Sequence, residues 1–439
     1  MEDTNTKLTE NKSEEQLIEI QNDNEISKLQ DSPRAWSVVA GSFLIHFFVL
    51  GLLYSFGIYQ QYFLSDLPHL GNSAGIAIIG SLALGTLSLF GLVSGRLADR
   101  IGYKTTILIG GFIIFVSLIL ASFATELWHY VLTQGFLFGF GCSLSYFPAV
   151  SAPSYWFTKQ RGLATGIAVS GSGIGGFSFS LIIQKLLDAF GIQWTLRITG
   201  LILLVAISGS AMLISLPAFK GKSRVSPPFP KQLLKDPVFI FLFLMALIGS
   251  FGYMVPVIFV PRYATEHLNL TSSQGALAVS LFNAASTVGR IFAGFFADRF
   301  FGRLNSFIGS FLTSGIAVVL LWSLSSSFEI LILFNVVNGF LAGGIISLLP
   351  VVISDIFGLQ ALASIIGLFY MSSFVGNFAG SPLAGVIIEL STNSVGKINW
   401  IPAIIYSGGL EIFSSIFGFG AIILLKRKNK AVTTSTANI

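Results

Sequence analysis

Charged residues are scarce in this sequence. Asp, Glu, Lys and Arg make up 10% of the 439 residues, whereas about 25% is usual for a soluble globular protein. Apolar residues make up 53%, and phenylalanine alone occurs 42 times. A chain with so few charges cannot cover its surface with polar groups. A water-soluble fold is therefore excluded, and a membrane protein is expected.

Cysteine, alternating strands and enzyme-like clusters are also missing. The single cysteine, Cys142, excludes an intramolecular disulfide. No segment alternates apolar and polar residues as the strands of an outer-membrane barrel do, so the apolar runs should be helices. No metal cluster, nucleophile–base pair or phosphate loop is apparent, so we expect neither enzyme activity nor a cofactor. The one formal dinucleotide motif, Gly171-x-Gly173-x-x-Gly176, follows no strand and is interpreted as a helix-packing surface.

Long apolar runs are what the sequence has instead. Runs of about 20 apolar residues predict transmembrane helices. Twelve such runs cover approximately residues 36–60, 74–95, 105–124, 128–152, 162–184, 195–216, 237–260, 273–296, 304–326, 328–353, 361–388 and 400–425. The expected fold class is an all-α membrane protein with twelve transmembrane helices.

The polar segments between and beyond these runs predict the orientation. Residues 1–35 are polar and acidic, lack the pattern of a cleavable signal peptide, and are expected to form a disordered tail. With both tails in the cytoplasm, 20 of the 25 Lys and Arg residues fall on the cytoplasmic side, which is a strong positive-inside signal. Residues 426–439 would form the second tail, and Asn269 in Asn-Leu-Thr would be a candidate glycosylation acceptor outside. The net charge of +5 needs no nucleic-acid partner to explain it.

A repeat follows the second and the eighth run. The segment "GRLADRIGYKTTILIG" is echoed by "GFFADRFFGRLNSFIG", and Asp99 and Arg100 match Asp298 and Arg299 at an offset of 199 residues. The repeat divides the chain into two six-helix halves, 36–216 and 237–425. A cytoplasmic linker rich in Pro and Lys joins them at 217–236.

The glycines and charges of this repeat are candidate gating residues. They are Gly95, Asp99, Arg100, Gly102, Asp298 and Arg299. Glycine permits the short turn, and the charged side chains can pair with each other or cap the end of a neighbouring helix. Such contacts would change if the halves rocked against each other. The alternative interpretation is that these charges only obey the positive-inside rule.

Four segments carry a family resemblance. The loop "GRLADRIGYK" resembles the signature of the major facilitator superfamily, and residues 34–426 fit its two-half, twelve-helix architecture. The segment "YWFTKQRGLATGIAVSGSGIGG" is similar to the start of helix 5 in the monocarboxylate porters. The stretches "FNAASTVGRIFAGFFADR" and "SFGIYQQYF" look more like the fungal homologues of that branch. The resemblance implies a secondary transporter that works by alternating access.

One arginine, Arg290, lies inside the eighth run, about 13 Å from its charged end. An arginine at mid-membrane costs ~2.5–3.5 kcal/mol on insertion scales, so it needs a polar environment or a function. The resemblance implies the function, because monocarboxylate porters carry an arginine in helix 8 that is thought to bind the substrate carboxylate through a planar, two-bond contact. The alternative is a permanent ion pair with Glu411 of helix 12, which this fold usually places at the periphery.

The sequence contains further candidates for the binding and coupling sites. Asn283, two helical turns away on the same face, and Tyr54 are candidate substrate-binding residues. His46 and Glu411 are candidate proton-coupling residues, although a lone histidine such as His46 can also serve packing. Other polar residues that could line a cavity are Gln60, Gln134, Tyr146, Asn335, Asn338, Tyr370 and Asn377.

The family pattern is incomplete at two positions. Animal members have an acidic residue four positions before the arginine, where this chain has Ser286, and a lysine in helix 1, near the place of Ile58. Proton-coupled lactate transport is therefore not implied. We expect a secondary transporter of a small, monocarboxylate-like organic anion in the plasma membrane or an internal membrane such as the vacuole. The alternatives are a facilitator of riboflavin or another planar solute, since the fungal branch includes proteins associated with riboflavin uptake, and a non-transporting receptor.

Overall fold

The computed structural model describes residues 31–70, 73–217, 231–392 and 398–436. Most of the predicted N-terminal tail and most of the predicted linker lie outside these residues. The described chain is helical, and its only β contact is an isolated bridge between Thr392 and Ile398. The predicted all-α membrane fold is therefore confirmed.

The N-terminal half (31–217) begins with a first span that contains a π-helical turn and is interrupted once, at Ser55. Its helices are α2 (Ala35–Ile45), the π-helical turn η1 (His46–Leu50), α3 (Gly51–Tyr54), α4 (Phe56–Asp66), the 3-10 turn η2 (Pro68–Leu70), α5 (Ser73–Leu89), α6 (Gly91–Ile101), α7 (Tyr103–Ala121), α8 (Leu127–Tyr130), the π-helical η3 (Val131–Leu137), α9 (Phe138–Ser151), α10 (Pro153–Trp156) and α11 (Arg161–Leu213).

The C-terminal half (231–436) has a similar plan, with its first span broken once. Its helices are the 3-10 turn η4 (Lys231–Lys235), α12 (Pro237–Tyr253), α13 (Val255–Glu266), α14 (Ser272–Phe296), the π-helical η5 (Ala297–Phe301), α15 (Arg303–Ala317), the π-helical η6 (Val318–Trp322), α16 (Phe328–Phe357), α17 (Leu362–Leu390) and α18 (Ile401–Thr436).

Twelve spans account for these helices. Ten continuous segments of the described chain are long and apolar enough to cross a bilayer, and α5 with α6 forms an eleventh span that bends by 49°. The twelfth arises because α11 contains two helices joined at Gly191, whose φ of 68° and ψ of 179° are not helical. The last helix runs to Thr436, beyond the predicted end at residue 425.

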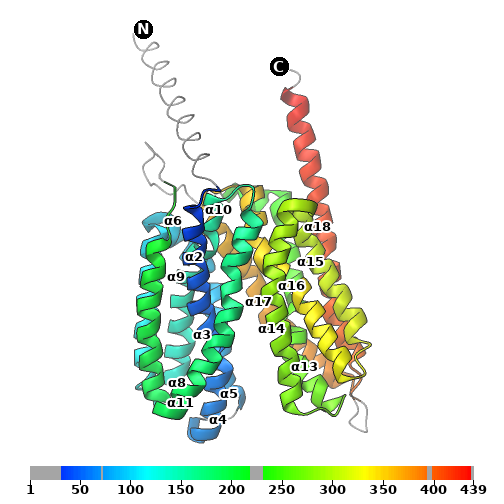
Figure 1. The fold of residues 1–439 in the computed structure, drawn as a ribbon. Helices are drawn as coiled ribbons and strands as arrows, with labels where there is room; N and C mark the ends of the chain where they lie inside the picture. The colour runs from blue at the N-terminus through cyan, green and yellow to red at the C-terminus, as the bar shows by residue number, and fades with distance from the viewer. Residues whose placement is uncertain (1–30, 71–72, 218–230, 393–397, 437–439) are drawn as a thin grey trace.

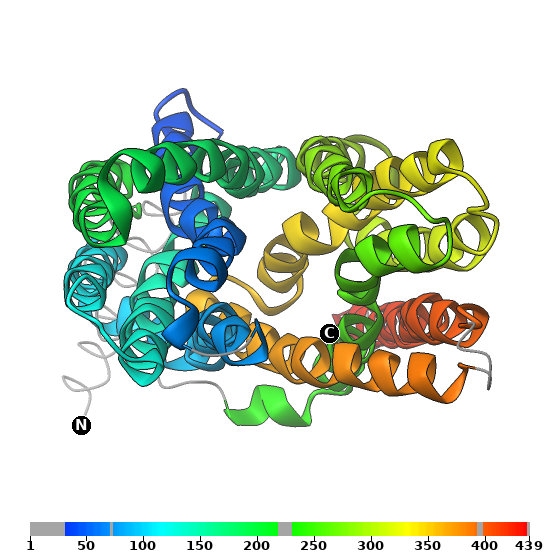
Figure 2. The ribbon, with the colours of Figure 1, turned by 90° about the horizontal axis from the view of Figure 1, so that it is seen from below.

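The two halves lie side by side (Figure 2). Helix α2 begins and α18 ends on the same side of the molecule, here called the tail side, at the top of Figure 1. Two helices carry most of the packing between the halves: α11 packs on α14 and α16, and α17 packs on α5, α6 and α9.

Glycines permit this close packing. A Cβ at Gly162 or Gly166 of α11 would lie 2.7 or 2.4 Å from a carbonyl oxygen of α14, and a Cβ at Gly171 or Gly175 would meet the carbonyl oxygens of Phe43 and Phe47 at 2.3 and 2.1 Å. The first part of α11 therefore contacts α14 through one set of small residues and the first span through the other. This is the close approach that small-xxx-small spacing predicts.

Candidate functional site

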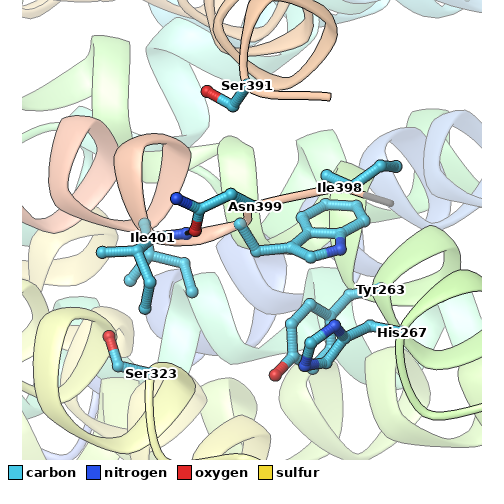
Figure 3. A pocket seen from close by; sticks show the side chains of 9 residues that line it. Tyr263, His267, Ser323, Ser391, Ile398, Asn399 and Ile401 are labelled. Carbon is cyan, nitrogen blue, oxygen red and sulfur yellow. Dashed lines mark hydrogen bonds between the residues drawn. The ribbon is translucent and has the colours of Figure 1, made fainter. Parts of the chain in front are cut away.

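One pocket of the described chain lies wholly within the C-terminal half. It has a volume of about 300 Å³ and is lined by Tyr263, His267, Ser323, Ser391, Ile398, Asn399, Trp400, Ile401 and Ile404. All of these residues belong to the C-terminal half, on α13, η6, α17, α18 and the segments that flank them (Figure 3). A solute that crosses between two rocking halves needs a site that both halves contact, so this pocket is not the candidate transport site.

Arg290 of α14 does lie at the contact between the halves. Only 5% of its surface is exposed. Its Nη1 donates to the carbonyl oxygen of Val169 at 3.0 Å and to Oγ of Ser172 at 2.5 Å, both on α11 of the other half. Its Nε is buried and has no hydrogen-bond partner within the described residues.

No carboxylate neutralises Arg290 among the described residues. The ion pairs of this part of the chain involve other residues, and none joins Arg290 to Glu411. The structure therefore contains a buried, uncompensated guanidinium with one unused donor. Burying such a charge is costly unless a partner of opposite charge can reach it.

Four tyrosines from both halves lie within electrostatic range of this guanidinium. This tyrosine cluster consists of Tyr54 on α3, Tyr146 on α9, Tyr253 on α12 and Tyr370 on α17. The hydroxyl of Tyr146 donates to that of Tyr370 at 2.6 Å, which links the two halves. Tyr54 is 49% exposed, whereas Tyr146 is 2% exposed. The cluster thus combines buried rings with at least one that is open to solvent or a ligand.

The two further residues predicted to bind substrate differ in position. Tyr54 belongs to the tyrosine cluster beside Arg290. Asn283 is exposed on α14, two turns from Arg290, and its backbone carbonyl accepts a hydrogen bond from Thr287 at 3.0 Å. No contact within the described residues brings its side chain to the arginine.

His46 is fully buried beside the cluster. Its Nδ1 lies 2.7 Å from the carbonyl oxygen of Ser42, which can only accept, so Nδ1 carries the proton and Nε2 is left as an acceptor. Nε2 is buried and has no hydrogen-bond partner in the described chain. The imidazole packs edge-on against Tyr146 at 5.2 Å and lies within electrostatic range of Arg290.

Glu411 is buried among the helices of the C-terminal half. It is 1% exposed on α18, and its side chain packs against Gly252 of α12 and Gly315 of α15. The absence of side chains at these two glycines leaves the space in which the carboxyl fits. Oε2 has no hydrogen-bond partner in the described residues.

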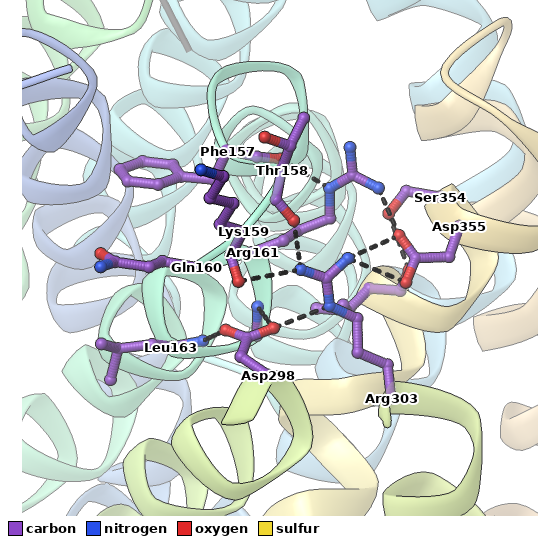
Figure 4. A network of polar contacts seen from close by, with 12 residues as sticks. Phe157, Thr158, Lys159, Gln160, Arg161, Leu163, Asp298, Arg303, Ser354 and Asp355 are labelled. Carbon is purple, nitrogen blue, oxygen red and sulfur yellow. Dashed lines mark hydrogen bonds and ion pairs between the residues drawn. The ribbon is translucent and has the colours of Figure 1, made fainter. Parts of the chain in front are cut away.

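Asp298 joins the halves on the tail side. Its carboxylate accepts from the backbone N–H groups of Gly162 and Leu163 at 3.0 and 2.8 Å, at the first turn of α11 in the other half, and from Nε of Arg303 at 2.7 Å (Figure 4). A carboxylate at a helix N-terminus is stabilised by the unpaired N–H groups and the helix dipole. We call this contact the Asp298 latch.

Asp99 makes the matching contact in the opposite direction. Its Oδ2 accepts from the hydroxyl and the backbone N–H of Ser364 at 2.5 and 3.3 Å, in the first turn of α17. The hydroxyl of Tyr103, at 3.4 Å from Oδ1, adds a contact within its own half. This Asp99 latch and the Asp298 latch follow the sequence repeat, since each acidic residue caps a helix of the other half.

Three charged residues strengthen the Asp298 latch. Asp355 forms ion pairs with Arg161 of the other half and with Arg303, which lies 2.9 Å away. Arg303 also donates to the carbonyl oxygens of Thr158 and Lys159, so it spans the halves (Figure 4). Sequence reasoning missed all three. A signal existed for Arg303, which follows the repeated aspartate by five residues as Lys104 follows Asp99.

The other predicted gating residues divide into two groups. A Cβ at Gly95 would lie 2.3 Å from the carbonyl oxygen of Ala363, and Gly102 has a φ of 96°, so both positions require glycine. Arg100 and Arg299 are exposed and form no hydrogen bond or ion pair within the described residues. These two arginines therefore fit the alternative interpretation, in which the charge serves orientation only.

The hydrogen bonds between the halves described above are those of Arg290, of Tyr146 and of the residues around the two latches on the tail side. Tyr155, whose hydroxyl donates to the carbonyl oxygen of Leu359 at 2.6 Å, adds to the two latches. The conformation is therefore closed on the tail side.

Comparison with known proteins agrees with this architecture. The model of the Major Facilitator Superfamily matches residues 36–271 and 242–437. The MFS-type transporter pynF of Aspergillus niger is 34% identical over 86% of this chain and 87% of its own length. The Agnestins efflux protein AgnL12 of Paecilomyces divaricatus is 31% identical over 91% and 89%, and the Fujikurins efflux protein of Gibberella fujikuroi is 29% identical over 90% and 83%. The fucose:proton symporter FucP of E. coli shares the fold, with a TM-score of 0.66 and 16% identity over 88% of this chain and 98% of its own.

Proposed function

This chain belongs to the Major Facilitator Superfamily and is a membrane transporter, and from that premise we propose that it exports an organic anion by alternating access. The observation that carries the proposal is Arg290. Its guanidinium lies between the halves, is not neutralised by a carboxylate of the described chain, and has an unused Nε donor. An acidic group of a substrate would supply the missing charge and accept a charge-assisted hydrogen bond.

The direction of transport is proposed from the relatives. Two of them are named as efflux proteins, and they align over most of this chain. The sequence resemblance alone implied a small monocarboxylate, which the same arginine would also bind. Export of an organic acid is favoured over uptake because efflux is what those relatives' names describe.

Orientation in the membrane follows from the basic residues. We propose that the tail side faces the cytoplasm, because 20 of 25 Lys and Arg residues fall on that side of the predicted topology. We place the chain in the plasma membrane, where export would carry the acid out of the cell. The conformation closed at the two latches would then be the outward-facing one. Opening toward the cytoplasm would require Asp99 to leave α17 and Asp298 to leave α11.

Proton coupling would depend on His46 or Glu411. Both are buried, and each has one side-chain atom without a hydrogen-bond partner in the described chain, His46 Nε2 and Glu411 Oε2. His46 is the one within electrostatic range of Arg290. A proton on His46 would therefore interact electrostatically with an acidic group bound to Arg290.

Export from cells tests the proposal. Cells that express the wild-type chain or Arg290→Ala are loaded with a panel of labelled aromatic and aliphatic carboxylates, and the rate of label loss is compared with that of vector-only cells. We expect at least one acid to leave wild-type cells faster, with the difference abolished by Arg290→Ala at equal protein level. An Arg290→Ala protein that exports as well as the wild type would remove the arginine from the binding site.

A further inference from the structure

The first and seventh spans are broken at equivalent positions. In the first span α3 ends at Tyr54 and α4 begins at Phe56, and in the seventh α12 ends at Tyr253 and α13 begins at Val255. The residues at the breaks have similar backbone angles, with φ −84° and ψ 4° at Ser55, and φ −84° and ψ −12° at Met254. Tyr54 and Tyr253 are 199 residues apart, the offset of the repeat that relates Asp99 to Asp298.

Each break has a local cause. Pro256 at the start of α13 has no backbone N–H and cannot continue the hydrogen bonding of α12. In the first span, the hydroxyl of Ser55 donates to the carbonyl oxygens of Gly51 and Gly176 at 2.8 and 3.0 Å, which satisfies backbone acceptors at the break. The two tyrosines therefore occupy the last helical position before a structurally fixed break in each half.

These two tyrosines lie near the same arginine, one in each half. Tyr54 and Tyr253 lie within electrostatic range of Arg290 and of each other. Tyr54 is 49% exposed and Tyr253 is half-buried. Neither hydroxyl has a hydrogen-bond partner among the described residues, and neither hydroxyl is completely shielded from solvent. By contrast, Tyr146 and Tyr370 use their hydroxyls on each other.

We propose that Tyr54 and Tyr253 form a two-sided clamp for the flat, conjugated body of an organic monoanion whose acidic group binds Arg290. This inference rests on the proposed function and specifies its substrate class. A single uncompensated cation selects a single negative charge. Aromatic side chains in two halves offer ring faces and edges to a planar π system, and their free hydroxyls can donate to ketone or phenol oxygens of the ligand.

The breaks give this clamp a mechanical role. A residue at the last position before a break is displaced when the segment beyond it changes its tilt. Movement of α4 or α13 would therefore bring a tyrosine toward the ligand or away from it. Occupancy of the clamp and the conformation of the first and seventh spans would be coupled.

A pair of acids with the same skeleton tests the clamp. The probes are 2-naphthoate, which is planar, and decahydronaphthalene-2-carboxylate, its saturated counterpart, titrated calorimetrically into the purified full-length chain. Burial of apolar area alone favours the saturated acid, because it has more hydrogen-covered surface. The clamp predicts the opposite, with 2-naphthoate bound about two- to ten-fold more tightly, the range given by aromatic contacts beyond area burial.

Variants of Tyr54 and Tyr253 test whether these two rings cause the preference for the planar acid. Tyr54→Leu and Tyr253→Leu should each reduce the ratio of the two affinities toward one, and Tyr54→Phe should preserve it. Tyr62→Leu is the matched control, because Tyr62 lies on α4 beyond the break and outside the tyrosine cluster. Should a leucine variant not fold, as judged by its melting temperature, the corresponding methionine variant replaces it.

The outcomes separate this inference from the proposed function. A saturated acid bound as tightly as 2-naphthoate by the wild type, an unchanged ratio in both leucine variants, or no binding of either acid would each overturn the clamp. The proposed function fails separately if Arg290→Ala leaves the affinity for both acids unchanged. Loss of both affinities in Arg290→Ala, with the planar preference lost only in the Tyr54 and Tyr253 variants, would support both.

Discussion

Neutralising Asp298 should open the tail side more than neutralising Asp99. Asp298→Asn removes the charge at the start of α11 but keeps one acceptor oxygen, so one of the two hydrogen bonds to Gly162 and Leu163 is lost or turned into a weaker, neutral one. Asp99→Asn still accepts from the hydroxyl of Ser364 and loses mainly the longer N–H contact of 3.3 Å.

The expected magnitudes follow from these contacts. A hydrogen bond to a charged group contributes about 1.5–3 kcal/mol, and a charge at a helix N-terminus about 0.3–1 kcal/mol. Asp298→Asn should therefore destabilise the closed conformation by roughly 2–4 kcal/mol, which shifts the population toward the tail-side-open state about 30- to 700-fold. For Asp99→Asn, roughly 1–2 kcal/mol gives a shift of about 5- to 30-fold.

The assay measures how fast a buried cysteine reacts with a hydrophilic maleimide. Cys142, the only natural cysteine, is buried, so the background is low. Ala164→Cys and Ala363→Cys place one reporter near each latch, at residues that are 0% exposed. Both reporters should react faster in Asp298→Asn than in Asp99→Asn, and Asp188→Asn, an exposed acid on α11 that accepts from Gln184, should react like the parent. Equal rates in Asp298→Asn and the parent, or acceleration at only the nearer reporter, would refute the latch.

Four further outcomes are expected. Arg290→Lys keeps the charge but loses the planar guanidinium, so the apparent dissociation constant of an acid found in the export screen should rise about ten- to hundred-fold. Arg290→Ala should bind that acid no better than Arg290→Lys does. An unchanged affinity in the lysine variant would contradict the two-bond contact. Because Arg290 and Glu411 form no ion pair, Glu411→Gln should not restore the melting temperature of Arg290→Ala, and a rescue would re-establish the ion-pair alternative. Partial burial raises the pKa of Asp31, but hydrogen bonds from Thr158, Lys159 and Gln160 outweigh it and hold that pKa below its ordinary value. Its contribution to stability is therefore present above the unfolded value of 3.8 and is lost as the pH falls below it, so the melting temperature of Asp31→Asn should depend less on pH in that acidic range, and identical pH profiles would show that the contact does not matter. Tags at both termini should be accessible only from the cytoplasm, and a terminus exposed outside would reverse the topology.

The sequence was sufficient for the fold because a bilayer imposes one length on every span. Apolar runs of that length predict twelve helices, and the described part of the chain contains twelve spans. The boundaries were less certain, because helices continue past the apolar runs. The polar segment with Lys185 and Asp188 marks the turn between the fifth and sixth spans, but the helices continue through it and meet at Gly191, a single residue with a non-helical backbone.

The site was predictable only where one residue carries its own signal. Arg290 stands out because a charge inside an apolar run is costly, and Asp99 and Asp298 stand out because they repeat. Their partners do not, since Ser364 lies 265 residues from Asp99 and the pairing exists only in the folded chain. Tyr253 was missed for a different reason: a tyrosine in an apolar run is usual, and only its 199-residue relation to Tyr54 marks it. The burial of Glu411 depends on two glycines of other helices, which no local pattern reveals.

The two latches resemble the paired contacts of a symmetric dimer. In a twofold homodimer the interface is isologous, so that residue i of one subunit touches residue j of the other and j touches i. Asp99 of α6, which caps α17, and Asp298 of η5, which caps α11, reproduce this arrangement within one chain. A homodimer has to strengthen or weaken both copies of such a contact together, whereas a fused chain can change them one at a time. The Asp99 latch depends mainly on Ser364, whereas the Asp298 latch has three additional charged residues. The two contacts are therefore alike in geometry but unequal in strength. Separation of the halves should therefore be sequential, beginning where Asp99 of α6 caps α17 and ending where Asp298 of η5 caps α11.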